Sequence, residues 1–134
     1  VLAMEPEVLI LDEPTAGLDP RGRDEILDVI KGLHEGRGLT IILVSHSMED
    51  VARYAERLIV MNHGSKMFDG TPREVFRHYK ELEAIGLAAP QTTYLIHDLR
   101  ERGAALDPDI TTIREAREAI LQLWAEEKGR DRHV

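Results

Sequence analysis

The sequence contains no cysteine and few aromatic residues, and its acidic residues outnumber its basic ones. Without cysteine there can be no disulfide scaffold and no thiolate metal site. With 17 Lys and Arg against 25 Asp and Glu, the 134 residues carry a formal net charge of −8. That balance argues against a nucleic-acid partner, because phosphate neutralisation needs clustered basic residues. No apolar run approaches the roughly 20 residues that a bilayer-spanning helix needs, and no signal-peptide pattern is present. These absences predict a soluble, acidic, intracellular protein.

Three short apolar runs predict buried strands. They lie at residues 8–11, 40–44 and 58–61 and do not alternate with polar residues. Continuous apolar runs of this length are typical of parallel strands that are covered on both faces. A helical pattern begins at Pro20, after the first run, and another begins after Ser47, after the second. This order predicts an α/β fold with a parallel sheet and right-handed crossover helices.

After the third run the pattern changes to a hairpin and then to helices. Residues 62–65 are typical of a tight turn, so residues 66–68 are expected to return as an antiparallel strand. A capping box at 71–74 predicts a helix start, and further helices are expected after Pro90 and from Thr112, where Glu115 completes a second capping box. The residues expected to face inward from the last two helices are Leu95, Ile96, Leu99, Ile113, Ala116, Ile120 and Leu123.

The first predicted strand ends in two adjacent carboxylates, Asp12 and Glu13. Open α/β sheets place ligands at the carboxyl ends of their strands, and the chain turns there, so both side chains can face one cleft. Asp12 offers the oxygen ligands that Mg²⁺ prefers, and Glu13 is suited to polarise an attacking water. The alternative is that Asp12 caps the next turn and Glu13 is solvated. For an isolated Asp-Glu pair this alternative is the stronger one. The residues around the pair therefore decide between a catalytic role and a structural one.

Those surrounding residues resemble a known family. Residues 8–20 read VLILDEPTAGLDP, and this stretch resembles the Walker B motif and D-loop of the ATP-binding cassette (ABC) ATPases. Residues 44–46 read VSH at the end of the second predicted strand, and they resemble the H-loop of the same family. The resemblance implies a partial P-loop NTPase fold.

The resemblance also implies roles for four residues. Asp12 would bind Mg²⁺, Glu13 would be the catalytic base, and His46 would contact the γ-phosphate of ATP and orient the attacking water. Asp19 would lie in the D-loop, which in this family contacts the opposite subunit of a head-to-tail dimer. The alternative role of Asp19 is to cap the helix that begins at Pro20, and both roles are compatible.

Other motifs of the family are absent from these 134 residues. There is no phosphate-cradling Gly-x-x-x-x-Gly-Lys-Ser/Thr loop, no Q-loop glutamine and no Leu-Ser-Gly-Gly-Gln signature. Residues 1–6 resemble the end of the helix that follows the signature. We therefore expect the carboxy-terminal portion of an ABC ATPase, inactive by itself and without tightly bound ATP or Mg²⁺.

The missing phosphate loop also has a structural consequence. In the family, the strand that carries this loop lies between the strands that correspond to 40–44 and 58–61. Its absence here is expected to leave strand edges unpaired. Either these two strands pair directly or a second copy of the chain covers the edges, and we favour self-association.

Residues 82–91 and 99–103 resemble one group within the family, the energy-coupling factor ATPases for cobalt, nickel and vitamin uptake. The resemblance implies an ATP-hydrolysing importer subunit, peripheral at the cytoplasmic face of a bacterial or archaeal membrane. Its partners would be a second ATPase subunit and transmembrane transporter subunits. The expected organisation is an ATPase core at 1–71, a helical extension at 72–125 and a charged, disordered tail at 126–134.

Two other functions stay open at this point: an interaction or dimerisation module that acts through the helical extension, and a soluble ABC ATPase without a transporter. Trp124 fits either packing against the body or a subunit contact.

His46 and Glu49 form an H-x-x-E pair, which the strand-helix context explains without a metal. The histidines that show no metal-ligand spacing are His34, His63, His78, His97 and His133. The transported substrate is not readable, because membrane partners select it.

Overall fold

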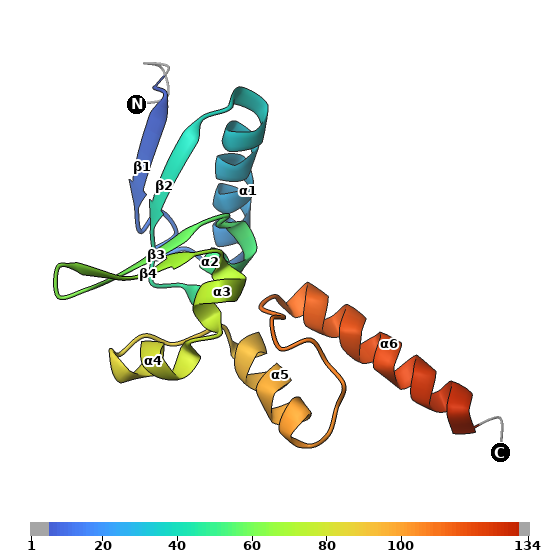
Figure 1. Ribbon diagram of the computed structural model, residues 1–134. Helices are drawn as coiled ribbons and strands as arrows, with labels where there is room; N and C mark the ends of the chain where they lie inside the picture. Colours follow the sequence, from blue (N-terminus) through green and yellow to red (C-terminus); the bar gives the residue numbers. More distant parts are fainter. Residues whose placement is uncertain (1–5, 132–134) are drawn as a thin grey trace. The chain divides into compact units, whose positions relative to one another are not determined.

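The computed structural model describes residues 6–131 (Figure 1). The helix end predicted at the start of the chain and His133 lie outside the described residues. The chain forms two compact units, one up to Ser47 and one from Met48 onward. The predicted functional boundaries at residues 71 and 125 stay predictions. Among the described helices, none combines the length and the apolar character that crossing a membrane requires.

The first unit consists of β1 (Val8–Asp12), α1 (Pro20–Arg37) and β2 (Thr40–Val44). The two strands are parallel, and α1 connects them and lies along one face of the pair (Figure 1). The α/β fold with a small parallel sheet and a crossover helix is therefore confirmed. The predicted third parallel strand is wrong, because in the described residues β3 pairs with β4 in a separate antiparallel sheet.

Helix α1 begins and ends where its sequence predicts. The Asp19 carboxylate accepts a hydrogen bond from Gly22 N–H at 2.7 Å, and Pro20 occupies the first turn. At the other end Gly38 adopts a left-handed φ of 65°, and its N–H bonds to the carbonyl of His34. Both ends are fixed by residues close in sequence. A carboxylate binds a free N–H group at the start of the helix, and a glycine adopts the positive φ that ends it. The helix-capping role of Asp19 is confirmed.

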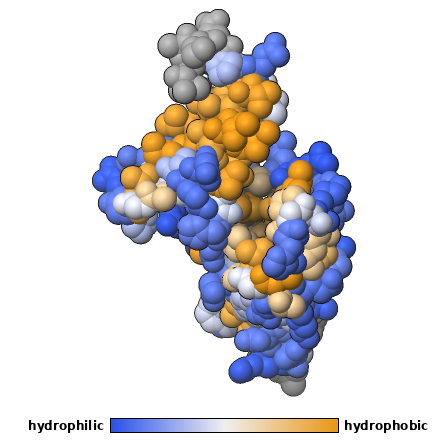
Figure 2. Space-filling model, turned by 90° about the vertical axis from the view of Figure 1, so that its left-hand side faces the viewer, coloured by the Kyte–Doolittle hydropathy of each residue, from blue (hydrophilic) through white to orange (hydrophobic). Residues whose placement is uncertain are grey.

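The opposite face of the parallel pair is bare and apolar. Alternate residues point to this face, and among them Ile10 is 66% exposed, with Val8, Ile42 and Val44 about half exposed. Figure 2 shows this apolar surface over the part of the molecule where β1 and β2 lie. The expectation that these strands are covered on both faces is therefore wrong for the described residues, because α1 covers one face only.

The second unit contains a hairpin and five helices among its described residues. They are α2 (Met48–Tyr54), β3 (Leu58–Asn62), β4 (Ser65–Gly70), α3 (Pro72–Phe76), α4 (Tyr79–Ala84), α5 (Gln91–Glu101) and α6 (Ile113–Asp131). The predicted hairpin is confirmed: His63 and Gly64 both have positive φ, 46° and 77°, as a two-residue type I′ turn requires. Helix α6 extends into the segment that was expected to be a disordered tail.

Two groups of buried side chains form the core of this unit. The first consists of Val51, Val60, Val75, Phe76, Leu82 and Ala89, and the second of Ile96, Leu106, Ile110 and Ala116. The predicted inward positions Leu99, Ile120 and Leu123 pack against the second group. The predicted inward orientation of Leu95 and Ile113 is wrong, since these residues are 47% and 75% exposed. Leu95 lies beside the fully buried Ile96, and Ile113 is the first residue of α6, so neither points into the core.

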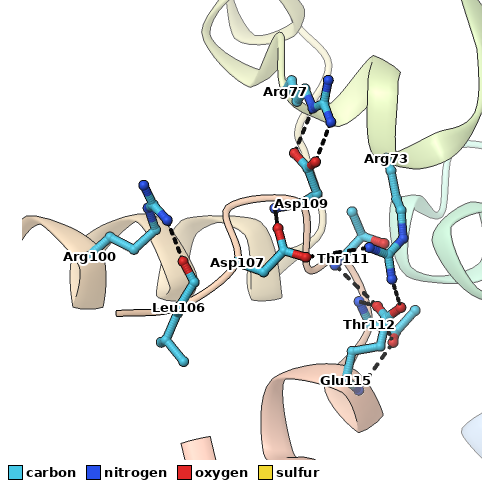
Figure 3. A network of polar contacts seen from close by, with 9 residues as sticks. All are labelled: Arg73, Arg77, Arg100, Leu106, Asp107, Asp109, Thr111, Thr112 and Glu115. Carbon is cyan, nitrogen blue, oxygen red and sulfur yellow. Dashed lines mark hydrogen bonds and ion pairs between the residues drawn. The ribbon is translucent and has the colours of Figure 1, made fainter. Parts of the chain in front are cut away.

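Ion pairs join α3 to the segment around the start of α6 (Figure 3). The Arg77 guanidinium binds the Asp109 carboxylate through two nitrogens, with Nε to Oδ1 at 2.6 Å. Arg73 pairs with Glu115 and, at 3.8 Å, with Asp107. The bidentate contact with Arg77 lowers the pKa of Asp109. These contacts tie together segments more than thirty positions apart in the chain.

The predicted capping box at the start of α6 is confirmed. The Thr112 N–H donates to the Glu115 carboxylate at 3.2 Å, and the Glu115 N–H reaches Thr112 Oγ1 at 3.4 Å. Because Glu115 also binds Arg73, one carboxylate both caps α6 and connects it to α3. The start of α6 is thereby fixed by local and long-range contacts together.

We expect Asp109→Asn to lower the Tm of this chain at pH 7, because the substitution removes the charge that Arg77 binds. The folded-state pKa of Asp109 is lowered, so the stabilisation is complete above the ordinary Asp pKa of about 4 and is lost as pH falls through the folded-state value. Thermal unfolding followed by circular dichroism should show a Tm difference at pH 7 that shrinks as the pH falls through the lowered folded-state pKa of Asp109. Asp98→Asn, on the exposed side of α5, is the control. A Tm difference that persists at low pH would contradict the assignment.

Candidate functional site

The carboxyl ends of β1 and β2 form one edge of the parallel pair, and the candidate site lies there. Asp12 stands opposite Val44 in the register of the two strands. The pairing continues one residue further, since Glu13 N–H donates to the Val44 carbonyl at 2.9 Å. Glu13 has a φ of 46°, a left-handed conformation that is uncommon for glutamate. Residues held in such conformations cluster at functional sites, where the surrounding structure maintains them.

His46 contacts Glu13 directly. Its Nδ1 lies 2.8 Å from Glu13 Oε1, and a carboxylate only accepts, so Nδ1 carries the proton in this contact. The Glu13 side chain is partly enclosed, whereas the His46 side chain is 81% exposed. Sequence analysis predicted both residues separately and missed the bond between them. The available signal was that both follow neighbouring parallel strands, whose carboxyl ends meet at one edge.

Asp12 is exposed at the end of β1, and its carboxylate has no ion-pair partner in the part of the chain that the structure describes. No group of three or more His, Cys, Asp or Glu side chains there could enclose a metal ion. Mg²⁺ does not need such a cage, because it is often bound by one or two carboxylates together with waters and substrate phosphates. An unpaired exposed carboxylate beside a second one fits that partial role.

The loop that leaves the site is ordered by its own backbone. Ala16 N–H donates to the Glu13 carbonyl at 3.1 Å, and Leu18 N–H donates to the Thr15 carbonyl at 3.2 Å. The Thr15 side chain is buried, and Gly17 supplies a left-handed φ of 77°. The loop therefore delivers Asp19 to the start of α1 in a defined position. The further role of Asp19 in a dimer contact stays a prediction.

Comparison with known proteins identifies the class to which this fold and site correspond. Residues 1–50 match the family model described as "AAA domain, putative AbiEii toxin, Type IV TA system". The solved structure of cbiO1 from Clostridium perfringens, part of the ABC transporter complex cbiONQ, aligns with a TM-score of 0.55 and 40% identity over 72% of this chain and 38% of that one. The α/β fold is that of a partial ABC ATPase domain.

Within that class, the sequence relatives are energy-coupling factor transporter ATP-binding proteins named EcfA2. The relative from Clostridioides difficile is 59% identical over 124 residues, which are 92% of this chain and 43% of the relative. The relative from Symbiobacterium thermophilum is 56% identical over 132 residues, 98% of this chain and 46% of the relative. The chain is thus a homologue of these proteins and spans less than half of their length. The predicted resemblance is confirmed.

The positive φ of Glu13 generates a prediction about stability. Glycine adopts left-handed conformations without the steric cost that a Cβ imposes, which is about 1 kcal/mol. We therefore expect Glu13→Gly to be at least as stable as Glu13→Ala, reversing the usual order in which glycine is the less stable of the two. Urea unfolding of both variants measures the difference. A Glu13→Ala variant that is clearly more stable than Glu13→Gly would show that the backbone there is unstrained.

Proposed function

We propose that this chain is part of an ATP-hydrolysing subunit of an ABC importer of the energy-coupling factor type. The observation that carries the proposal is the 2.8 Å contact between Glu13 and His46 at the carboxyl edge of the parallel strands. Its sequence context supports the same conclusion, since several relatives of this type are 51–59% identical to the chain. The activity belongs to an ATPase that includes these residues together with a phosphate loop.

The chemistry follows from the two side chains. Glu13 accepts a proton from the water that attacks the γ-phosphate, a role suited to a partly enclosed carboxylate. The contact of Glu13 with His46 Nδ1 orients the imidazole, so that Nε2 can form a hydrogen bond with a different group. When the imidazole is protonated, both ring nitrogens donate. His46 can then bind Glu13 through Nδ1 and a γ-phosphate oxygen through Nε2.

A Mg²⁺ ion would be held by Asp12, whose exposed carboxylate fits the hard oxygen ligands that this ion takes. When bound with ATP, Mg²⁺ neutralises phosphate charge and orients the β- and γ-phosphates. ATP itself needs further backbone N–H donors and a lysine from a phosphate loop, which these 134 residues do not contain.

The proposed partners are a second ATPase subunit, contacted through Asp19, and transmembrane transporter subunits. The structural neighbour cbiO1 belongs to a transporter complex, which supports a peripheral position at the cytoplasmic face of a membrane. The transported class would be a metal ion such as cobalt, or a vitamin.

One observation favours a second function for this chain, namely protein interaction through a surface on α6. Trp124 is 56% exposed, and the Lys128 ammonium lies over its ring at 4.2 Å from the centroid. Ile113 and Leu121 on the same helix are exposed as well. An exposed tryptophan beside aliphatic residues is typical of subunit contacts, so we propose that α6 contributes to the contact with a second ATPase subunit.

In an ATPase that contains these residues and a phosphate loop, Glu13→Gln is expected to abolish turnover while ATP still binds. The substitution removes the base but not the groups that bind phosphate, and a general base contributes about 10²- to 10⁴-fold. Steady-state phosphate release and nucleotide titration measure the two effects. Glu7→Gln, exposed just before β1, should leave both unchanged. Retention of more than about a tenth of the turnover would remove Glu13 from this role.

We also predict that the 134-residue chain self-associates through the bare face of β1 and β2. A contiguous exposed apolar face is typical of protein interaction sites, and a symmetric dimer needs only one such surface. Ile10→Lys should therefore make the chain monomeric in sedimentation velocity runs at micromolar concentration. Trp124→Ala should weaken association without abolishing it. A wild-type chain that is monomeric under the same conditions would overturn this prediction.

A further inference from the structure

Glu13 and His46 are both attached to one backbone position, Val44 at the end of β2. The Val44 carbonyl accepts the hydrogen bond from Glu13 N–H at 2.9 Å, and His46 follows Val44 by two residues. A closed ring results, because His46 Nδ1 lies 2.8 Å from Glu13 Oε1. All of these residues belong to the first compact unit, which ends at Ser47. The geometry of the pair is therefore set within that unit, by the course of the backbone from Val44 to His46.

Of the two side chains in the pair, that of His46 is the less constrained. It is 81% exposed, so packing does not fix it, whereas Glu13 is partly enclosed and has its backbone bonded to β2. Holding an exposed side chain in one geometry costs rotamer entropy. The backbone that carries His46 must therefore place the imidazole close to the Glu13 carboxylate for their contact to be stable.

The side chain of Ser45 holds that backbone in a turn. Ser45 lies between Val44 and His46 and is partly buried. Its Oγ accepts a hydrogen bond from Ser47 N–H at 3.1 Å. A serine hydroxyl that binds the N–H two residues later closes a tight local turn. His46 is the middle residue of this turn, so loss of the hydroxyl would let the peptide groups on either side of the histidine rotate.

We propose that Ser45 is a positioning residue for His46, whose hydroxyl fixes the turn that directs the imidazole Nδ1 toward the Glu13 carboxylate. In this role Ser45 acts only through His46 and contacts neither the substrate nor the reacting atoms. A side chain that takes part in catalysis must be held within about 0.5 Å of its productive position, which hydrogen bonds from neighbouring residues provide. The inference deepens the proposed function and rests on it for its effect on ATP hydrolysis.

The structural part of the proposal can be tested on the 134-residue chain by ¹⁵N NMR of the His46 imidazole. Spectra are recorded at about pH 8.5, above the ordinary histidine pKa of about 6.5. The tautomer of a neutral imidazole follows the hydrogen bond that its nitrogens make. Wild-type chain should carry the proton on Nδ1, which donates to Glu13. Ser45→Ala should shift the ring toward the Nε2–H form that a solvated histidine prefers. Ser45→Thr keeps a hydroxyl and should restore the Nδ1–H form.

Three further variants make the experiment specific. Thr40→Ala removes a hydroxyl from the exposed opposite end of β2 and should leave the His46 signals unchanged. His46→Gln identifies those signals among the six histidines of the chain. If circular dichroism shows that Ser45→Ala does not fold, Ser45→Cys takes its place and should give the same shift, because a thiol is close in size to a hydroxyl and only a weak acceptor.

Three outcomes would overturn the proposal. Unchanged His46 signals in a folded Ser45→Ala chain would mean that the hydroxyl only closes the turn before α2, which begins at Met48. A Ser45→Thr chain that behaves like Ser45→Ala would show that the hydroxyl is not the cause of the shift. A wild-type ring with its proton on Nε2 would show that the contact with Glu13 does not form in solution.

A second measurement separates this inference from the proposed function. In an ATPase that includes these residues and a phosphate loop, Ser45→Ala should lower kcat per ATP-binding site about tenfold with little change in the KM for ATP, since misplacing a catalytic group by about 1 Å can lower the rate as much as 100-fold. Ser45→Thr should restore kcat. Wild-type protein without ATPase activity would refute the proposed function, and the NMR result would still decide the role of Ser45. An unchanged kcat in an active enzyme would refute the positioning role alone.

Discussion

The hydrogen bond from Glu13 N–H to the Val44 carbonyl is the constraint on which the candidate site depends. It extends the parallel pairing one residue beyond the end of β1. The same bond holds Glu13 in a left-handed conformation, which a glutamate would not adopt without support. That conformation turns the chain out of the strand and brings the Glu13 carboxylate within 2.8 Å of His46. A backbone contact between two strands thus creates the side-chain pair.

The parallel pair itself is only half covered in the described residues. Leu9 and Leu27 are buried on the side of α1, whereas Ile10 and Ile42 on the other side face solvent. Parallel strands are normally covered on both faces, because the crossover helices that connect them pack on the sheet. The described chain has one such helix against this pair. The chain spans less than half the length of its relatives. A bare face on the parallel pair and the absence of a phosphate loop from these 134 residues both agree with that partial coverage.

The helical part of the second unit is held by charged side chains as well as by its core. Arg73 of α3 and Arg77, the residue that follows the helix, bind carboxylates that precede or begin α6, and Glu115 contributes to a capping box at the same time. The start of α5 differs from that of α6, because its N-terminal N–H group is bound by Glu49, a residue of the distant helix α2. Helix starts in this unit are therefore completed by residues both near and distant in sequence. This arrangement links the segment after His46 to the helices that follow.

The local structure was predictable because it depends on neighbours in sequence. Asp19 caps α1, Glu74 and Glu115 complete capping boxes, and His63-Gly64 forms the hairpin turn. Each of these features uses one side chain or one backbone conformation within four residues of its partner. Predictions that depended on distant packing were less reliable. The assignment of residues 58–61 to the parallel sheet and the burial of Leu95 and Ile113 were wrong, because periodicity does not say which surface is present to cover a residue.

By itself, the sequence determined the class of fold, the ends of most helices, the hairpin and the identity of the candidate residues Asp12, Glu13 and His46. The tertiary structure alone decided that Glu13 and His46 bind each other and that Glu49 caps a helix 42 positions away. The physical reason is the difference in range. Caps and turns are settled by bonds along a few residues, whereas contacts between distant side chains exist only after parallel pairing and core packing have placed their backbones.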